Sequence, residues 1–330
     1  MERRVLGRTG RMVSVVGLGT WQLGADWGEV TDDDSRAVLE AALEAGVTFF
    51  DTADVYGDGR SEQAVGRLVK DHPDAGITVA TKMGRRMDQV PENYVLSHFR
   101  EWTDRSRSNL GVDTIDLVQL HCPPTAVYST AEVYDGLDTL VSEGAIAAYG
   151  VSVETTAEAL EAMTHPGVAS VQIILNAFRL KPLEQVLPAA SEAGIGIIAR
   201  VPLASGLLSG RYTKETTFAA EDHRTYNRKG EAFDVGETFS GVDYDTGVTA
   251  ATEFAELVGA LPEDLTPAQA AIAWIWQQPG VSTVIPGARN PDQARANAAA
   301  GAVPALGPLF ASKVKDLYDR HFRAQVHDRW

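Results

Sequence analysis

The chain contains one cysteine, Cys122, among its 330 residues, so no disulfide can form within it and a reducing compartment fits. No apolar run reaches the roughly 18 residues that cross a bilayer, and the opening Met-Glu-Arg-Arg-Val lacks the apolar core of a signal peptide. Positive charge is also scarce: 29 Lys and Arg against 45 Asp and Glu give a net charge of −16, which disfavours nucleic acid or an anionic membrane as a partner. We therefore expect a cytoplasmic protein that is a monomer or a weak homo-oligomer.

Sequence motifs for a metal site or a separate dinucleotide-binding domain are missing as well. The chain has neither HExxH nor CxxC, so no metal site is expected. The segment Gly17-Leu18-Gly19-Thr20-Trp21 resembles the start of the GxGxxG fingerprint, but Gln22 stands where the third glycine is required. A glycine-bearing turn after a strand is the simpler interpretation of this segment.

What the chain does have is a regular alternation of strands and helices, with enough hydrophobic residues, 44%, for a large core. After a hairpin over 3–16, apolar strands rich in Val and Ile are predicted near Val13 and over 47–50, 77–80, 115–120, 145–151, 170–175, 195–199 and 282–285. Helices are predicted between Thr31 and Gly46 and over 61–70, 92–109, 131–143, 155–163, 183–193, 267–277 and 309–323. Eight strand–helix units without a linker favour an α/β fold, a single-domain (β/α)8 TIM barrel, over an open doubly wound sheet.

One segment breaks this alternation after the seventh strand. Residues 204–246 are polar and glycine-bearing, and they are too long for an ordinary connection, so we predict a cofactor-covering loop that is either an ordered lid or a partly mobile insertion. We call them the lid segment. Residues 305–330 are predicted to form a C-terminal helix and tail over the outside of the barrel or its mouth.

Polar residues follow successive strands at their C-terminal ends: Asp51, Lys82, His121, Ser152, Asn176 and Arg200. Taken alone, Asp51 is explained by a helix cap or a buried ion pair, Lys82 by a solvated surface and His121 by a core position. In a parallel barrel, however, all of these strand ends meet at one mouth. Their convergence predicts a reactive site.

Tyr56 lies just beyond the strand that ends in Asp51. A free phenol has a pKa of about 10, and a nearby ammonium such as that of Lys82 lowers this value. Asp51 would keep the ammonium charged and aimed, and His121 would orient a substrate oxygen. Such a tyrosine could protonate a carbonyl oxygen while a hydride from a nicotinamide cofactor reaches the carbonyl carbon.

Four residue types in order, each at a strand exit, resemble the catalytic tetrad of the aldo-keto reductase superfamily: Asp51, Tyr56, Lys82 and His121. The likeness runs from Gly17 to Asn297, nearly the whole chain. The resemblance implies a barrel that binds NADP(H) across its mouth and reduces aldehydes or ketones to alcohols, with Tyr56 as general acid. It also implies substrate contacts from Trp21, Tyr56 and His121.

The resemblance implies the cofactor contacts too. Ser152 and Gln172 match residues that hold the nicotinamide carboxamide, residues 202–211 resemble a pyrophosphate loop, and Arg289 would face a 2′-phosphate and favour NADP over NAD. The implied cofactor-binding residues are Gly19, Thr20, Trp21, Asp51, Ser152, Gln172, Arg200, Val201, Pro202, Leu203, Ala204, Ser205, Gly206, Leu208, Gly210, Arg211, Gly287, Arg289, Gln293 and Asn297.

The sequence also departs from that pattern and leaves other functions open. Arg200 stands where many relatives place an aromatic ring against the nicotinamide, and Gly287 replaces a common lysine. The segment around Gly287 and the basic pyrophosphate loop also resemble potassium-channel β subunits, which bind NADPH as regulatory partners. A Schiff-base aldolase that uses Lys82 is a third possibility, although Asp51 would keep this lysine protonated and poorly nucleophilic.

Overall fold

The computed structural model describes residues 1–24, 30–234 and 236–330. Within them, eight parallel strands lie side by side in chain order: β3 (Leu18–Gly19), β4 (Phe49–Asp51), β5 (Thr78–Met83), β6 (Leu117–His121), β7 (Tyr149–Ser152), β8 (Val168–Ile174), β9 (Gly196–Arg200) and β10 (Val281–Val284). Parallel bridges join Val16 to Val284 and Gly19 to Gly287, so the two edges of the sheet also meet. The predicted (β/α)8 barrel is therefore confirmed.

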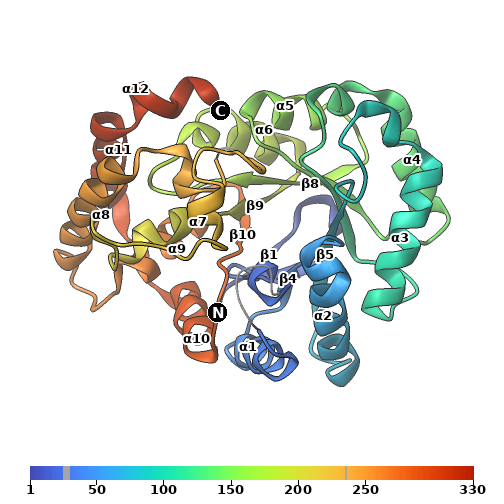
Figure 1. The fold of residues 1–330 in the computed structure, drawn as a ribbon, viewed down its shortest axis with the longest axis horizontal. Helices are drawn as coiled ribbons and strands as arrows, with labels where there is room; N and C mark the ends of the chain where they lie inside the picture. The colour runs from blue at the N-terminus through green and yellow to red at the C-terminus, as the bar shows by residue number, and fades with distance from the viewer. Residues whose placement is uncertain (25–29, 235) are drawn as a thin grey trace.

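Helices cover the outside of this barrel, as Figure 1 shows. Those between and after the strands are α1 (Asp32–Glu44), α2 (Arg60–Asp71), α3 (Leu96–Leu110), α4 (Ala131–Ser142), α5 (Thr156–Ala162), α6 (Val186–Ala193), α8 (Tyr244–Gly259), α9 (Pro267–Trp276) and α10 (Pro291–Ala299). The chain ends in α11 (Gly307–His321) and the short α12 (Arg323–Val326). No helix in the described part of the chain combines the length and the apolar character that crossing a membrane requires.

Local sequence signals explain where these helices begin. In α1 the hydroxyl of Thr31 accepts a hydrogen bond from the Asp34 backbone at 3.0 Å, and Asp34 Oδ2 accepts one from the Thr31 backbone at 3.1 Å. Thr266 and Gln269 form the same reciprocal pair at α9, where Pro267 occupies the first turn. Such capping boxes satisfy backbone N–H groups that the helix itself leaves without partners.

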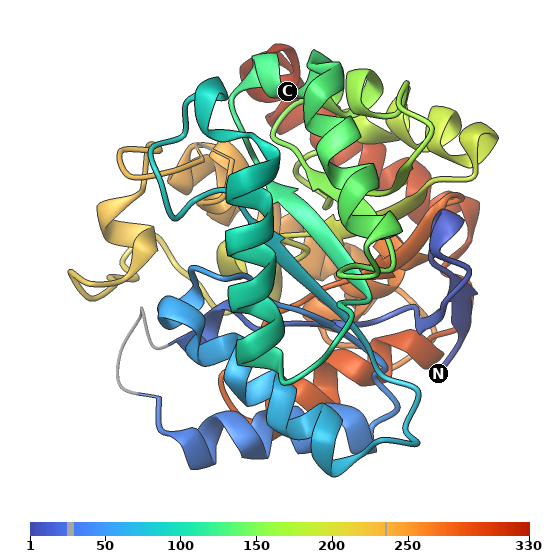
Figure 2. The same ribbon diagram turned by 90° about the vertical axis from the view of Figure 1, so that its right-hand side faces the viewer.

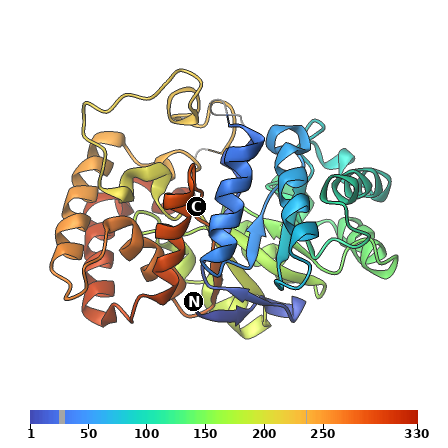
Figure 3. The ribbon, with the colours of Figure 1, turned by 90° about the horizontal axis from the view of Figure 1, so that it is seen from below.

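An N-terminal hairpin closes the end of the barrel opposite the lid segment, as Figures 2 and 3 show. It pairs β1 (Arg3–Val5) with β2 (Met12–Ser14) in antiparallel register. Leu6 and Val13 are fully buried and pack inside the barrel in one apolar cluster with Phe49. Because this end is filled with apolar side chains, the polar strand ends at the other mouth are where a ligand can enter.

The sequence placed the first barrel strand near Val13, and this placement is wrong. Val13 pairs with Arg4 in the hairpin. The first barrel strand is β3, where Leu18 pairs with Phe50 and Gly19 with Asp51. Both segments are short and apolar, so the sequence pattern does not distinguish them.

The lid segment contains more regular structure than its composition suggested. It holds a 3-10 helix (Ala204–Ser209), the short helix α7 (His223–Tyr226) and a second 3-10 helix (Phe239–Gly241), and its predicted end overlaps α8. Helices α8 and α10 were not predicted from the sequence. The signals for α8 are Asp243, which accepts a hydrogen bond from the Thr246 backbone at 3.0 Å, and a buried face at helical spacing: Val248, Ala251, Phe254 and Val258.

Candidate active site

Three of the four predicted catalytic residues meet at the mouth of the barrel. Asp51 ends β4 opposite Ala80 of β5, and Lys82 lies two residues further along β5, on the same face of the sheet. Lys82 Nζ donates to Asp51 Oδ1 at 2.5 Å and to the hydroxyl of Tyr56 at 3.3 Å. Asp51 and Lys82 are each 2% exposed, so this ion pair is withdrawn from water, whereas Tyr56 is only partly buried.

Two glutamines of the barrel interior hold the other oxygen of Asp51. Gln172 Nε2 donates to Asp51 Oδ2 at 2.8 Å and Gln119 Nε2 donates to it at 3.1 Å. Both amides are buried, in β8 and β6. These donors fix the carboxylate that aims Lys82 at Tyr56. Gln119 was not among the predicted site residues, although a glutamine inside the apolar strand β6 is a usable signal.

Burial sets the protonation states of this group. Desolvation raises the pKa of Tyr56 above its ordinary value, and the positive charge of Lys82, which lowers it, does not outweigh this effect. The expectation of a lowered phenol pKa is therefore wrong in direction, because the sequence does not reveal burial. At neutral pH the phenol is protonated, the form that a general acid needs.

Lys82 carries a full positive charge in this arrangement. Burial disfavours its ammonium, but Asp51 and Tyr56 outweigh burial, and the pKa of Lys82 is raised above its ordinary value. A Schiff-base lysine must instead lose its proton to become a nucleophile. The raised pKa of Lys82 thus argues against the aldolase alternative.

His121, the fourth predicted catalytic residue, ends β6 and faces Tyr56. The two ring centroids are 5.9 Å apart in an edge-to-face arrangement. Burial lowers the pKa of His121 well below its usual value, and the charges of Arg85 and Lys82 lower it further. Its Nδ1 atom is buried without a hydrogen-bond partner among the described residues. A neutral imidazole beside the phenol can orient a substrate oxygen.

Two arginines hold the turn that carries Tyr56. Arg86 donates to Asp58 Oδ1 at 2.6 Å, and Arg105 of α3 donates to the same atom at 2.8 Å and to the Asp58 backbone oxygen at 2.9 Å. The backbone of Gly57 and Asp58 is left-handed, with φ values of 59° and 54°. A non-glycine residue in this conformation needs support from its surroundings, and the arginines supply it.

Arg105→Met should lower kcat about tenfold, because the turn loses two contacts and the Tyr56 hydroxyl drifts from its position beside Lys82. The KM for the NADPH that the sequence leads us to expect should not change. Arg107→Met, on the same helix, is the control, because Arg107 pairs with Asp104 at the surface. Steady-state kinetics and thermal unfolding of both variants test this; a lower Tm with an unchanged kcat would reduce Arg105 to a structural role.

Several residues expected at the nicotinamide end line one pocket with Tyr56, Lys82 and His121. Ser152 ends β7, Gln172 lies in β8 and Arg200 ends β9, and the pocket also includes Trp21. Arg200 donates to the backbone oxygen of Val153 at 3.2 Å. Its charge is paired with carboxylates of the lid segment, which the sequence did not predict.

The predicted pyrophosphate loop winds into an irregular turn. Val201, Ala204 and Ser205 have positive φ values of 53°, 47° and 54°, and Gly206 follows at 98°. The φ angle changes sign between Leu203, at −102°, and Ala204, and a turn of this kind can form a concave group of backbone amides that suits an anion. The hydroxyl of Ser205 donates to the Glu237 backbone oxygen at 2.8 Å, so this loop is tied to the lid segment.

The residues expected at the adenosine end also lie together, at the start of α10. The Arg289 backbone donates to Gln293 Oε1 at 2.9 Å, and Asn297 Nδ2 donates to the Gly287 backbone oxygen at 3.1 Å. The guanidinium of Arg289 lies 3.5 Å from Asp222 of the lid segment. The lid segment therefore reaches the cation that would face a 2′-phosphate, a contact that sequence reasoning missed.

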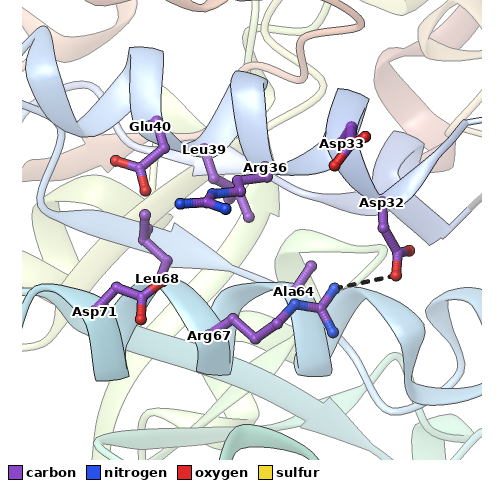
Figure 4. A pocket seen from close by; sticks show the side chains of 9 residues that line it. All are labelled: Asp32, Asp33, Arg36, Leu39, Glu40, Ala64, Arg67, Leu68 and Asp71. Atoms are coloured by element: carbon purple, nitrogen blue, oxygen red, sulfur yellow. Dashed lines mark ion pairs between the residues drawn. The ribbon is translucent and has the colours of Figure 1, made fainter.

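A second pocket lies on the outside of the barrel, between α1 and α2 (Figure 4). Its lining is Asp32, Asp33, Arg36, Leu39, Glu40, Ala64, Arg67, Leu68 and Asp71. Asp32 and Arg67 form an ion pair of 3.7 Å within it. Its charges are of both signs and no predicted site residue belongs to it. Among the described residues, no cluster of His, Cys, Asp or Glu is placed to hold a metal ion.

Comparison with known proteins gives the same picture over nearly the whole chain. The model of the Aldo/keto reductase family matches residues 15–319. The aldo-keto reductase YhdN of Bacillus subtilis (strain 168) is 32% identical over 302 residues, which cover 90% of this chain and 87% of the relative. The probable voltage-gated potassium channel subunit beta of Arabidopsis thaliana is 28% identical and covers 96% of both chains.

Solved structures agree with these sequence matches. The glycerol dehydrogenase AKR11B4 from Gluconobacter oxydans has a TM-score of 0.79 at 29% identity, covering 97% of this chain and 95% of that one. An aldo-keto reductase from Klebsiella pneumoniae, solved in complex with NADPH, has a TM-score of 0.70 at 23% identity and covers 96% of both chains. The second likeness supports the fold alone.

The barrel, the polar site at the ends of its strands and the family match together define an oxidoreductase built on a (β/α)8 scaffold. The chain belongs to the aldo/keto reductase family, because the family model spans most of its length and YhdN shares almost a third of its residues.

Proposed function

We propose that this chain reduces aldehydes or ketones to alcohols with NADPH as hydride donor, and that Tyr56 is the general acid. The observation that carries the proposal is the position of Lys82, which donates to Asp51 on one side and to the Tyr56 hydroxyl on the other. Burial keeps the phenol protonated in the ground state, and Lys82 places a positive charge where negative charge develops after proton transfer.

The residues at the mouth fit an extended NADP(H) molecule. Ser152 and Gln172 present polar groups beside Tyr56 in the pocket, the turn around Ser205 suits a pyrophosphate, and Arg289 lies at the adenosine end. Membership of the aldo/keto reductase family supports the choice of cofactor. When bound, the nicotinamide supplies the hydride.

The protein's own residues would handle the proton. The Tyr56 hydroxyl donates its proton to the carbonyl oxygen as the carbonyl carbon becomes tetrahedral. The resulting phenolate is stabilised by Lys82, which Asp51 keeps charged and in place. His121, whose imidazole is uncharged at neutral pH, holds the carbonyl oxygen near the phenol. In the reverse direction the phenolate accepts the alcohol proton.

The direct test is the loss of NADPH absorbance with a panel of sugars, aromatic aldehydes and quinone-like carbonyls, with NADH as the cofactor control. Turnover of at least one carbonyl with NADPH supports the proposal. Tight NADPH binding with negligible turnover on the whole panel would favour the alternative function, an NADPH-binding regulatory subunit. The likeness to the Arabidopsis channel subunit is the observation that supports this alternative.

Arg289→Ala should weaken NADPH binding about tenfold and leave NADH binding unchanged, because a charge-assisted hydrogen bond contributes about 1.5–3 kcal/mol. Arg295→Ala is the matched control, since Arg295 also lies on the surface of this region but pairs with Glu44. Fluorescence titration with each cofactor measures the effect. Equal losses for NADPH and NADH would show that Arg289 does not contact the 2′-phosphate.

A further inference from the structure

Two arginines of the barrel mouth are paired with carboxylates of the lid segment directly above the candidate active site. Arg85 follows β5, and Arg200 ends β9. Asp234 bridges them, 2.8 Å from Arg85 and 3.1 Å from Arg200, and Glu237 forms a second ion pair with Arg200. All four side chains line the pocket that contains Tyr56.

The ion pair of Arg200 with Asp234 is withdrawn from water. The side chains of Arg200 and Asp234 are 9% and 7% exposed. Burial alone would raise the pKa of Asp234, but a hydrogen bond from Glu154 and the charges of both arginines hold it below its usual range. Burial and the same hydrogen bond raise the pKa of Glu154, whereas Asp234 has both arginines as ion-pair partners. Asp234 is therefore the charged partner.

Lys82, Arg85 and Arg200 line the pocket, and each of these cations is already paired with a carboxylate. Lys82 pairs with Asp51, which is not one of the lining residues, and Arg85 and Arg200 pair with Asp234 and Glu237, which are. Aromatic side chains form part of the remaining wall, where Phe233 of the lid segment packs edge-on against Trp21 at a centroid distance of 5.5 Å. A substrate that enters this pocket meets aromatic faces, neutral hydrogen-bonding groups and charged groups that are already ion-paired.

We propose that the lid carboxylates make this pocket selective for uncharged carbonyl compounds, with Asp234 as the specificity-determining residue. The inference rests on the proposed function and names its substrate class. An anionic substrate would have to displace a buried carboxylate from two arginines or lie beside it, and charges that are close together and shielded from water repel strongly. An uncharged carbonyl compound avoids both costs.

The wild-type protein provides the first test. With saturating NADPH, kcat/KM for methyl 4-formylbenzoate should exceed that for the 4-formylbenzoate anion, which has the same aromatic ring, by about tenfold or more. Equal values, or a preference for the anion, would overturn the inference while leaving carbonyl reduction itself intact.

Substitutions test the role of Asp234 in substrate selectivity. Asp234→Asn removes one negative charge, so the ratio of anion to ester kcat/KM should rise about tenfold, and the double variant with Glu237→Gln should raise it further. Comparing ratios cancels any effect on cofactor binding. Glu231→Gln, an exposed acid of the same segment, is the control and should leave the ratio unchanged. An unchanged ratio in folded Asp234→Asn would exclude the assigned role.

Binding of unreactive analogues separates this inference from the proposed function. Calorimetry of the NADPH-loaded protein should detect methyl benzoate binding more tightly than benzoate. If neither aldehyde is turned over but this order holds, the proposed function fails and the selectivity stands. Tighter benzoate binding, or no binding of either analogue, overturns the selectivity.

Discussion

Tyr56→Phe should lower kcat for carbonyl reduction by about 10²–10⁴-fold, the usual contribution of general acid catalysis. The phenyl ring keeps the packing against Trp21 and His121, so the pocket keeps its shape. Only the proton and the hydrogen bond with Lys82 are lost. Binding of NADPH, measured by fluorescence titration, should therefore stay unchanged. A variant that retains full turnover would remove Tyr56 from the role of proton donor.

Lys82→Met should abolish measurable turnover and lower the free energy of unfolding by about 3–5 kcal/mol, because Asp51 would remain as a buried charge without its partner. Denaturant unfolding measures the loss. The double variant with Asp51→Asn removes both charges and should recover most of the stability, while activity stays absent.

This separation of stability from activity is the informative part of that experiment. A double variant as unstable as Lys82→Met would mean that the ion pair does not account for the loss. A double variant with restored turnover would mean that neither charge serves the chemistry. The hydrogen bonds from Gln119 and Gln172 can persist to an Asn side chain, which makes Asp51→Asn a conservative choice.

Much of the fold could be predicted because parallel barrel strands leave a strong local signal. Strands such as β6 and β8 are buried along their whole length, and helices such as α1 begin at side-chain caps that are visible in the sequence. The order of polar residues at the strand ends then placed Asp51 beside Lys82. Strand spacing and strand direction suffice for that inference.

The features that could not be predicted from the sequence depend on contacts between distant segments. Arg85 and Asp234 are 149 residues apart, and nothing local indicates that they meet. The hairpin strand β2 and the barrel strand β3 look alike until their pairing is known. The direction of the Tyr56 pKa shift depends on burial, which is a property of the assembled barrel.

The most direct test of the central claim is the single-turnover rate of hydride transfer from bound NADPH to an aldehyde, followed as pH rises. Reduction needs the protonated phenol, and burial raises the pKa of Tyr56 above its usual value of about 10. The wild-type rate should thus hold through neutral pH and fall only in strongly alkaline solution, and the residual rate of Tyr56→Phe should lack that fall. The same alkaline fall in both proteins would contradict the assignment of Tyr56 as the acid.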